Sequence, residues 1–152
     1  MATRRIQREL ADLSNTPSDQ FTAGPASDND LLIWEAKLTG PATSAYAGGV
    51  FSVNLTFSSD YPSNHQRHVK FNTKIYHPNV DEDGSICIGV LKPDVWKPSN
   101  KIVDILHSLI LILEEPNADD AINTSVAEVM NNPAGGKEKF EKTVKEWIKK
   151  YC

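Results

Sequence analysis

Two runs of alternating apolar and polar residues constrain the fold of this chain more than any other feature. In "FSVNLTF", residues 51–57, every second residue is apolar, and "LLIWEAKL", residues 31–38, repeats the period. Successive side chains of a strand point to opposite faces, so both runs predict strands with one buried face. The segments "FTAGP" (21–25) and "HVKF" (68–71) predict two shorter strands. Because the connectors are short and rich in turn residues, we expect an antiparallel meander.

Helical periodicity precedes and follows these strands. Ile6, Leu10 and Leu13 recur at helical spacing, which predicts an amphipathic helix over about 3–14, ended ahead of Pro17. The run "KIVDILHSLILIL" is apolar on nearly every side and predicts a central helix packed on the sheet. Shorter and longer helices are predicted in "AINTSVAEVM" and "KEKFEKTVKEWIKKY". The expected N-cap of the central helix is one of two residues, Ser99 or Asn100.

Strands and helices are therefore segregated along the chain. This order predicts an α+β fold: an N-terminal helix, a four-stranded antiparallel meander sheet, a central helix and two C-terminal helices. No linker or repeat divides the sequence, so one domain over residues 1–152 is expected. The outlier is an irregular stretch over about 72–99. Long loops inside compact domains are usually functional, which directs attention to this stretch.

Composition narrows the functional classes. The formal net charge of -4 argues against a general nucleic-acid binder, which is usually basic. The 2 cysteines, Cys87 and Cys152, do not make a disulfide framework. The start of the chain lacks the apolar run of a signal peptide, and no apolar run reaches the length of a membrane helix. We therefore expect a cytoplasmic or nuclear protein without a membrane partner.

The irregular stretch contains "YHPNVDEDGSICIG", residues 76–89, around one cysteine. Cys87 alone is most simply a small buried residue, but the neighbouring glycines allow close backbone approach, which a nucleophilic thiol needs. His77 is expected to brace the loop as a packed ring, and Pro78 stiffens it. The Asn79 side chain could hold loop carbonyls, or it could face an oxyanion formed at Cys87.

A second polar cluster, "EEPNADDAI", residues 114–122, follows the central helix. Asp119 and Asp120 would by default cap the next helix. A carboxylate beside a thioester could instead orient an incoming amine and take its proton. Paired cysteine–histidine spacing for a metal is absent, so no metal site is expected, whereas a Cys–His protease stays open as an alternative.

The chain resembles the ubiquitin-conjugating enzymes over nearly its whole length. The motifs that carry the resemblance occur in order and are "RRIQREL", "GPATSAYAGGVF", "DYP", "IYHPNVDEDGSICIGVL", "VWKPSNKI" and "EEPNADDAI". The resemblance implies that Cys87 accepts ubiquitin as a thioester from an activating enzyme and passes it to a substrate lysine or a ligase cysteine. Asn79 would stabilise the oxyanion or hold the active loop, and Asp120 would position and deprotonate the attacking lysine.

Further roles follow from the same resemblance. Tyr76, His77, Pro78, Ile88 and Asn117 would support the active site. No metal or small cofactor is implied, because ATP is used by the activating enzyme. Arg5, Pro62, Ser63, Trp96 and Pro98 would face the activating enzyme or a RING or HECT-type ligase. Thr22 would bind a second ubiquitin on the outer sheet face, or be an ordinary strand threonine. The protein would act as a monomer on substrate proteins.

Three departures from the family pattern carry expectations of their own. Ser63 stands where many relatives have a large apolar residue after "YP", so pairing with common ligases is expected to be weak or altered. The following loop, "SNHQRHVKF", lacks the usual Pro-Pro and should be more mobile and more polar. Gly89 replaces a residue that is often acidic in lysine-active relatives, yet Asp120 is retained, which favours transfer to lysine. The rival functions are conjugation of another ubiquitin-like modifier and non-catalytic ubiquitin binding.

Overall fold

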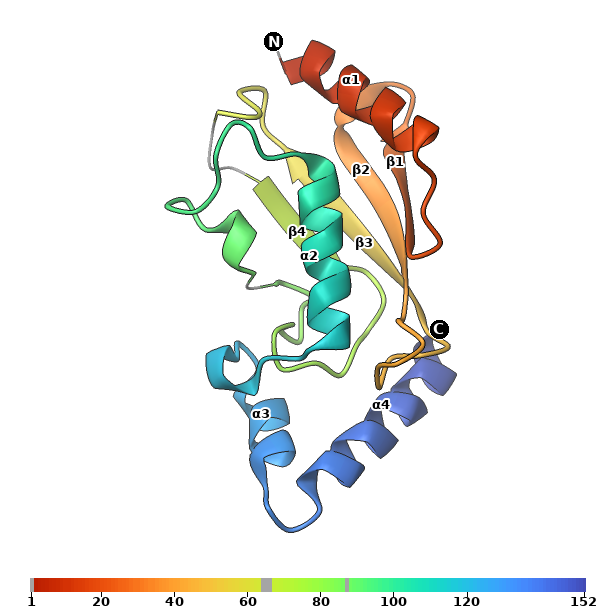
Figure 1. Cartoon of the computed structure of the whole chain (residues 1–152), viewed down its shortest axis with the longest axis vertical. Coiled ribbons are helices and arrows are strands. Elements are labelled where there is room, and N and C mark those ends of the chain that lie inside the picture. The colour runs from red at the N-terminus through yellow and green to blue at the C-terminus, as the bar shows by residue number, and fades with distance from the viewer. Residues whose placement is uncertain (1, 64–66, 87) are drawn as a thin grey trace.

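A four-stranded antiparallel sheet in the order β1-β2-β3-β4 forms the centre of the molecule, which is a computed structural model (Figure 1). Residues 2–63, 67–86 and 88–152 are described. The sheet consists of β1 (Phe21–Ser27), β2 (Asp30–Thr39), β3 (Val50–Phe57) and β4 (Arg67–Phe71). The helices are α1 (Ala2–Asn15), α2 (Ile102–Glu114), α3 (Thr124–Asn131) and α4 (Gly136–Tyr151), with 3-10 turns η1 (Gly89–Leu91) and η2 (Ala118–Asp120). This arrangement confirms the predicted α+β architecture and meander.

The register of the sheet explains the alternating sequence pattern. Trp34 pairs with Leu55, and Leu38 pairs with Phe51, so the apolar residues of β2 and β3 share one face. All four of these side chains are at most 1% exposed. A slip of one residue would turn this entire apolar set toward solvent, so the pattern fixes the pairing.

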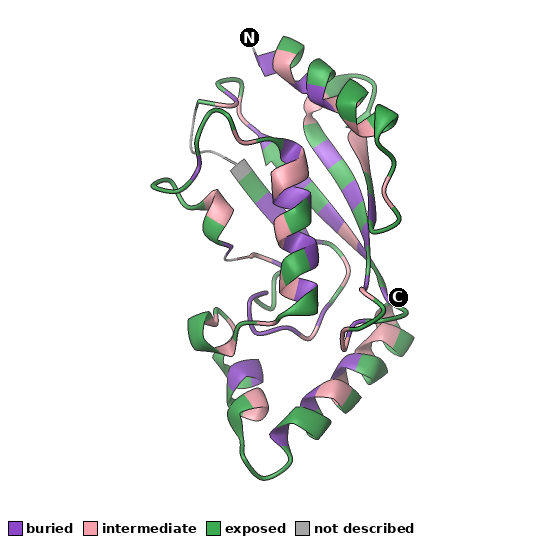
Figure 2. Cartoon of the chain, viewed as in Figure 1, coloured by how far each residue is buried: buried purple, intermediate pink, exposed green. Residues whose placement is uncertain are grey.

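Helix α2 crosses the inner face of the sheet and is buried along one side (Figures 1 and 2). The residues that it buries are Ile102, Ile105, Leu106, Leu109, Ile110 and Leu113. Its opposite side faces outward, and Leu111 there is 53% exposed. The central helix is therefore covered on one face, although its sequence is apolar nearly all round.

The predicted caps of α2 and α3 are wrong. Helix α2 begins after Lys101, whose backbone N–H donates to the Asp104 carboxylate at 2.8 Å. Asn100 instead uses its side-chain oxygen to accept the Lys97 N–H at 2.8 Å, because the preceding loop turns there. At α3 the cap is Asn123, whose side chain accepts the Val126 N–H. The two aspartates of the acidic cluster lie earlier, in η2.

Helices α3 and α4 lie at the end of the sheet opposite to α1 (Figure 1). In α4, Phe140 and Val144 are buried, while Lys142, Lys145 and Glu146 are exposed, and Figure 2 shows the striping of buried and exposed residues along the helix. This confirms the predicted amphipathic helix. Among the described segments, no helix combines the length and apolar character needed to cross a membrane.

Candidate functional site

The site begins at the His77-Pro78-Asn79 turn, where the histidine ring is fully buried. Its Nδ1 accepts the backbone N–H of Asn79 at 2.9 Å, so its Nε2 must carry the proton and donate to the Ile112 carbonyl at 2.6 Å. Burial lowers the pKa of His77 from 6.5 to about 4, although the hydrogen bond to Ile112 acts in the opposite direction. The ring is therefore neutral and fully bonded, an arrangement that agrees with the expected bracing role and leaves no ring nitrogen for the general base of a protease.

Tyr46 supports this turn from the connector between β2 and β3. Its ring stacks on His77 with centroids 5.2 Å apart, and its hydroxyl donates to the Tyr76 carbonyl at 2.6 Å. The side chain is 0% exposed. Sequence reasoning missed this residue, and the available signal was one large aromatic residue among the small turn residues of "GPATSAYAGG".

The Asn79 side chain joins this turn to the acidic cluster about forty residues further on. Its Nδ2 donates to the carbonyls of Asn117 at 2.9 Å and Asp120 at 3.1 Å. Its Oδ1 accepts the backbone N–H of Asn117 at 2.9 Å. The Pro78 carbonyl adds two bonds by accepting the N–H groups of Ile122 and Asn123 at 3.0 and 2.9 Å. The structure thus brings together two clusters whose contact the sequence spacing could not establish.

These bonds bear on the two roles considered for Asn79. A carboxamide nitrogen has two N–H donors, and both are directed at backbone carbonyls here. The side chain is 3% exposed, so an unpaired carbonyl left behind would be costly. The geometry favours the loop-holding role, since donation to an oxyanion would require one of these bonds to break.

The turn after Asn79 reverses the chain toward residue 86. Val80 forms an antiparallel bridge with Ile86, so the residue after Asn79 lies beside the residue before position 87. Gly84 allows this reversal, because its φ is 90° and an added Cβ would lie 2.2 Å from the Phe71 carbonyl oxygen. Cys87 itself lies outside the described residues, so the predicted nucleophile stays a prediction.

The chain that follows contributes a cation to the site. Lys92, just after η1, places its Nζ 3.9 Å from Oδ2 of Asp120, and these side chains are 48% and 67% exposed. Ile88 is 6% exposed and packs in the hydrophobic core. At Gly89, among the described residues beyond its chain neighbours, no atom lies within 4 Å of where a Cβ would be.

The ring of Tyr76 contacts two aromatic residues of α4. Its ring centroid is 5.4 Å from that of Trp147 and 5.8 Å from that of Phe140. Burial raises the pKa of the Tyr76 hydroxyl above its ordinary value. These contacts pack the residue before the His77-Pro78-Asn79 turn against α4, and the expected support of the active site by Tyr76 stays a prediction.

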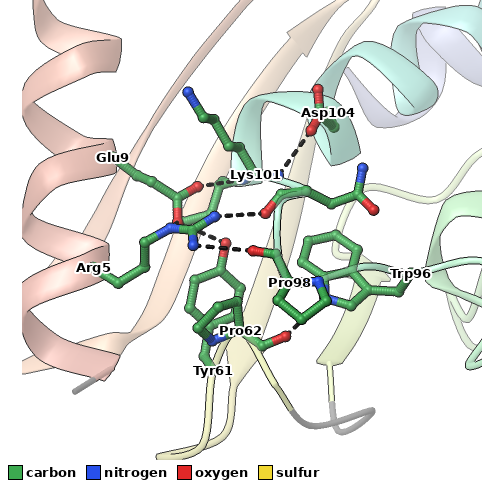
Figure 3. Close-up of polar contacts among 10 residues, drawn as sticks. Arg5, Glu9, Tyr61, Pro62, Trp96, Pro98, Lys101 and Asp104 are labelled. Atoms are coloured by element: carbon green, nitrogen blue, oxygen red, sulfur yellow. Dashed lines mark hydrogen bonds and ion pairs between the residues drawn. The ribbon is translucent and has the colours of Figure 1, made fainter.

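At the far end of α2, one buried carboxylate organises the predicted ligase face (Figure 3). Glu9 of α1 is 3% exposed. It accepts bonds from Arg5 Nε at 3.0 Å, the Tyr61 hydroxyl at 2.7 Å and the Ile102 backbone N–H at 2.6 Å. The Arg5 guanidinium also donates to the carbonyls of Pro98 and Asn100 at 3.0 and 2.8 Å. Arg5 therefore connects α1 to the 96–101 loop. From the sequence we expected Arg5 to contact partner proteins and did not predict this structural role.

The other predicted binding residues differ in accessibility. Trp96 is 7% exposed and donates from Nε1 to the Pro62 carbonyl at 2.9 Å, so it joins the two loops from inside (Figure 3). Ser63 and Pro98 are exposed. Thr22 is also exposed, on β1. The expectation for the polar loop falls on residues 64–66, which the structure does not describe.

The comparison with known families agrees with this geometry. A family model described as "ubiquitin-conjugating enzyme" matches residues 5–148 of the chain. The matched region contains the buried His77-Pro78-Asn79 turn, the acidic segment bonded to it and nearly all of the sheet and helices. Members of this family interact in general with ubiquitin, an activating enzyme and ligases. The chain belongs to the ubiquitin-conjugating enzyme family.

Proposed function

We propose that the protein carries ubiquitin as a thioester on Cys87 and transfers it to the amine of a lysine or to a ligase cysteine. In the first step, the Cys87 thiolate attacks the thioester carbonyl of ubiquitin on the activating enzyme. A new C–S bond forms, the old C–S bond breaks, and the enzyme's thiolate leaves and takes a proton from solvent. No metal or cofactor takes part in this exchange.

In the second step, a neutral amine attacks the Cys87 thioester. The C–N bond forms, the C–S bond breaks, and the amine gives up a proton as the Cys87 thiolate leaves. Asp120 would orient the amine and accept that proton, a role suited to an exposed carboxylate. Asn79 would act by holding the Asp120 backbone in place through its 3.1 Å bond to the carbonyl.

The observation that carries this proposal is the bonding of Asn79 to the acidic segment. Three hydrogen bonds from one buried side chain fix Asn117 and Asp120 beside the turn that precedes Cys87. A purely structural loop would not require an exposed carboxylate there, whereas amine transfer uses one. The family match supports the same assignment.

The test is thioester formation. The protein is incubated with activating enzyme, ATP and ubiquitin, and run on gels with and without reductant. We expect an adduct that reductant removes, that is lost in Cys87→Ala, and that reductant no longer removes in Cys87→Ser, because serine forms an oxygen ester.

Two outcomes would support the rival functions instead. No adduct with ubiquitin, together with an adduct to another ubiquitin-like protein, would identify a different modifier. No adduct with any modifier, together with measurable non-covalent ubiquitin binding, would indicate a binding module. Discharge of the purified conjugate to free lysine or free cysteine then shows which acceptor is preferred.

A further inference from the structure

The ion pair between Lys92 and Asp120 is the feature of the site that the proposed reaction does not use. Lys92 Nζ lies 3.9 Å from Asp120 Oδ2. An ammonium on a flexible chain beside this carboxylate resembles an acceptor lysine, which at neutral pH arrives as an ammonium and must lose a proton before it attacks. The protein's own side chain therefore stands where the substrate group is expected.

Both partners are held in position by their backbones. The Lys92 N–H donates to the Gly89 carbonyl at 3.0 Å, and the Lys92 carbonyl accepts the N–H groups of Val95 and Trp96 at 3.0 Å each. On the other side, the Asp120 carbonyl accepts a bond from Asn79. Two segments that come from different parts of the sequence are thus fixed so that these two side chains meet.

We propose that Lys92 competes with the acceptor lysine for the Asp120 carboxylate and so raises the acceptor concentration that half-saturates transfer. This inference rests on the proposed function of Asp120. A site that is free for only part of the time binds its ligand more weakly by that fraction. The side chains of Lys92 and Asp120 are 48% and 67% exposed, so the pair opens readily and acts as a competitor instead of a lock.

The experiment is single-turnover discharge of the purified ubiquitin conjugate across a range of free lysine concentrations. Lys92→Gln should lower the half-saturating lysine concentration by up to about fivefold, the size expected of an exposed ion pair, while the maximal rate changes little. Lys92→Arg retains the pair and should keep a half-saturating concentration close to that of the wild type. Lys145→Gln, which removes one exposed charge on α4, controls for net charge.

Substitution of Asp120 separates pairing from simple repulsion between cations. In an Asp120→Asn background, Lys92→Gln should no longer lower the half-saturating concentration. A decrease that persists there would overturn the proposal, because Lys92 would then act at a distance. An increase in Lys92→Gln alone would also overturn it, since Lys92 would then be helping to orient Asp120.

The outcomes distinguish this inference from the proposed function. If no conjugate forms, both fail together. If the conjugate forms and Asp120→Asn slows discharge, but Lys92→Gln behaves like the wild type, only the competition is refuted. Titration of the unloaded protein with Nα-acetyl-lysine amide, followed at the Asp120 backbone amide by NMR, gives a readout that needs no conjugate, and Lys92→Gln should bind more tightly there.

Discussion

At the scale of single residues, the site depends on buried polar side chains whose partners are backbone groups. His77 is 0% exposed and Asn79 is 3% exposed, and every bond found for them holds a main-chain atom. Backbone atoms cannot rotate away as side chains can, so such bonds define one loop geometry. An unsatisfied buried polar group costs about 1–3 kcal/mol, which makes alternative geometries unfavourable.

The protonation of His77 is a first prediction. We expect ring-nitrogen NMR correlations to show the neutral form with the proton on Nε2 down to pH values near its pKa of about 4. Between pH 6.5 and about 4, the unfolded chain binds a proton at this residue that the folded chain does not. The ring's contribution to the free energy of unfolding is therefore complete above pH 6.5 and falls with pH, by up to about 3 kcal/mol. A charged ring in the folded protein at pH 6 would contradict this.

Asp120 allows a second prediction. Asp120→Ala should slow discharge of the conjugate to free lysine by about tenfold to a hundredfold, while loading from the activating enzyme is unchanged. The reason is that loading involves no amine, whereas discharge does. Asp119→Ala removes the neighbouring exposed carboxylate and should discharge normally. Equal discharge rates for Asp120→Ala and the wild type would remove Asp120 from the mechanism.

At the scale of elements, α2 is held at both ends by side chains from other segments. Its first N–H, at Ile102, donates to Glu9 of α1, and the Ile112 carbonyl near its last turn accepts from His77. The first N–H groups of a helix have no partner within it, and a carboxylate there also interacts favourably with the helix dipole. Helix α2 therefore connects α1 and the predicted ligase face to the His77-Pro78-Asn79 turn as one packed element.

Glu9 gives the third prediction. Glu9→Ala should lower the free energy of unfolding by about 3 kcal/mol, because it leaves the Ile102 N–H and the Tyr61 hydroxyl without this partner and removes the ion pair of Arg5. Tyr61→Phe removes one of these bonds and should cost about 1 kcal/mol. The exposed Glu146→Ala on α4 should change stability by less than about 0.5 kcal/mol. Urea unfolding measures all three, and equal values for Glu9→Ala and Glu146→Ala would contradict the buried network.

At the scale of the whole molecule, the sheet and α2 separate two regions. Helix α1 and the 96–101 loop lie toward one end of α2, joined by Arg5 and Glu9, and α3 and α4 lie toward the other end (Figures 1 and 3). In the first region Ser63 and Pro98 are exposed, and the two loops that carry them are joined by the hydrogen bond from buried Trp96 to the Pro62 carbonyl. If this region is the ligase face, as predicted, we expect its exposed residues to determine which partners bind.

Ser63 carries the fourth prediction. Ser63→Phe should strengthen binding to a common RING ligase domain by about tenfold, since it restores an aromatic anchor at an exposed position on this face. Asn131→Phe places the same ring on the exposed surface of α3 and should not change the affinity. Isothermal titration with the isolated RING domain measures both. An unchanged affinity for Ser63→Phe would show that this position does not determine ligase pairing.

Local pattern accounts for what the sequence predicted correctly. The strands, their meander, the helices and the packed, hydrogen-bonded ring of His77 follow from periodicity, turn residues and the properties of a histidine before proline. These features are local because the faces of a strand or helix repeat within a few residues. The predicted caps were wrong because several polar residues lie near a helix start and any of them could cap it. In the structure, the Asn100 side chain accepts a bond within the preceding turn, and the Asp104 carboxylate accepts the Lys101 N–H at the start of α2.

The contacts that make the site could be decided only by tertiary structure. Asn79 meets Asn117 and Asp120 across about forty residues, and Glu9 meets Ile102 across 93. Lys92, which precedes α2 in the sequence, likewise contacts Asp120, which follows it. Periodicity states which side of an element is buried but not which distant group packs against it, because that depends on how all the elements fill one common core. The sequence by itself therefore determined which segments form helices and strands and which residues are candidates for the site. Only the packing of the tertiary structure decided which distant residues contact one another.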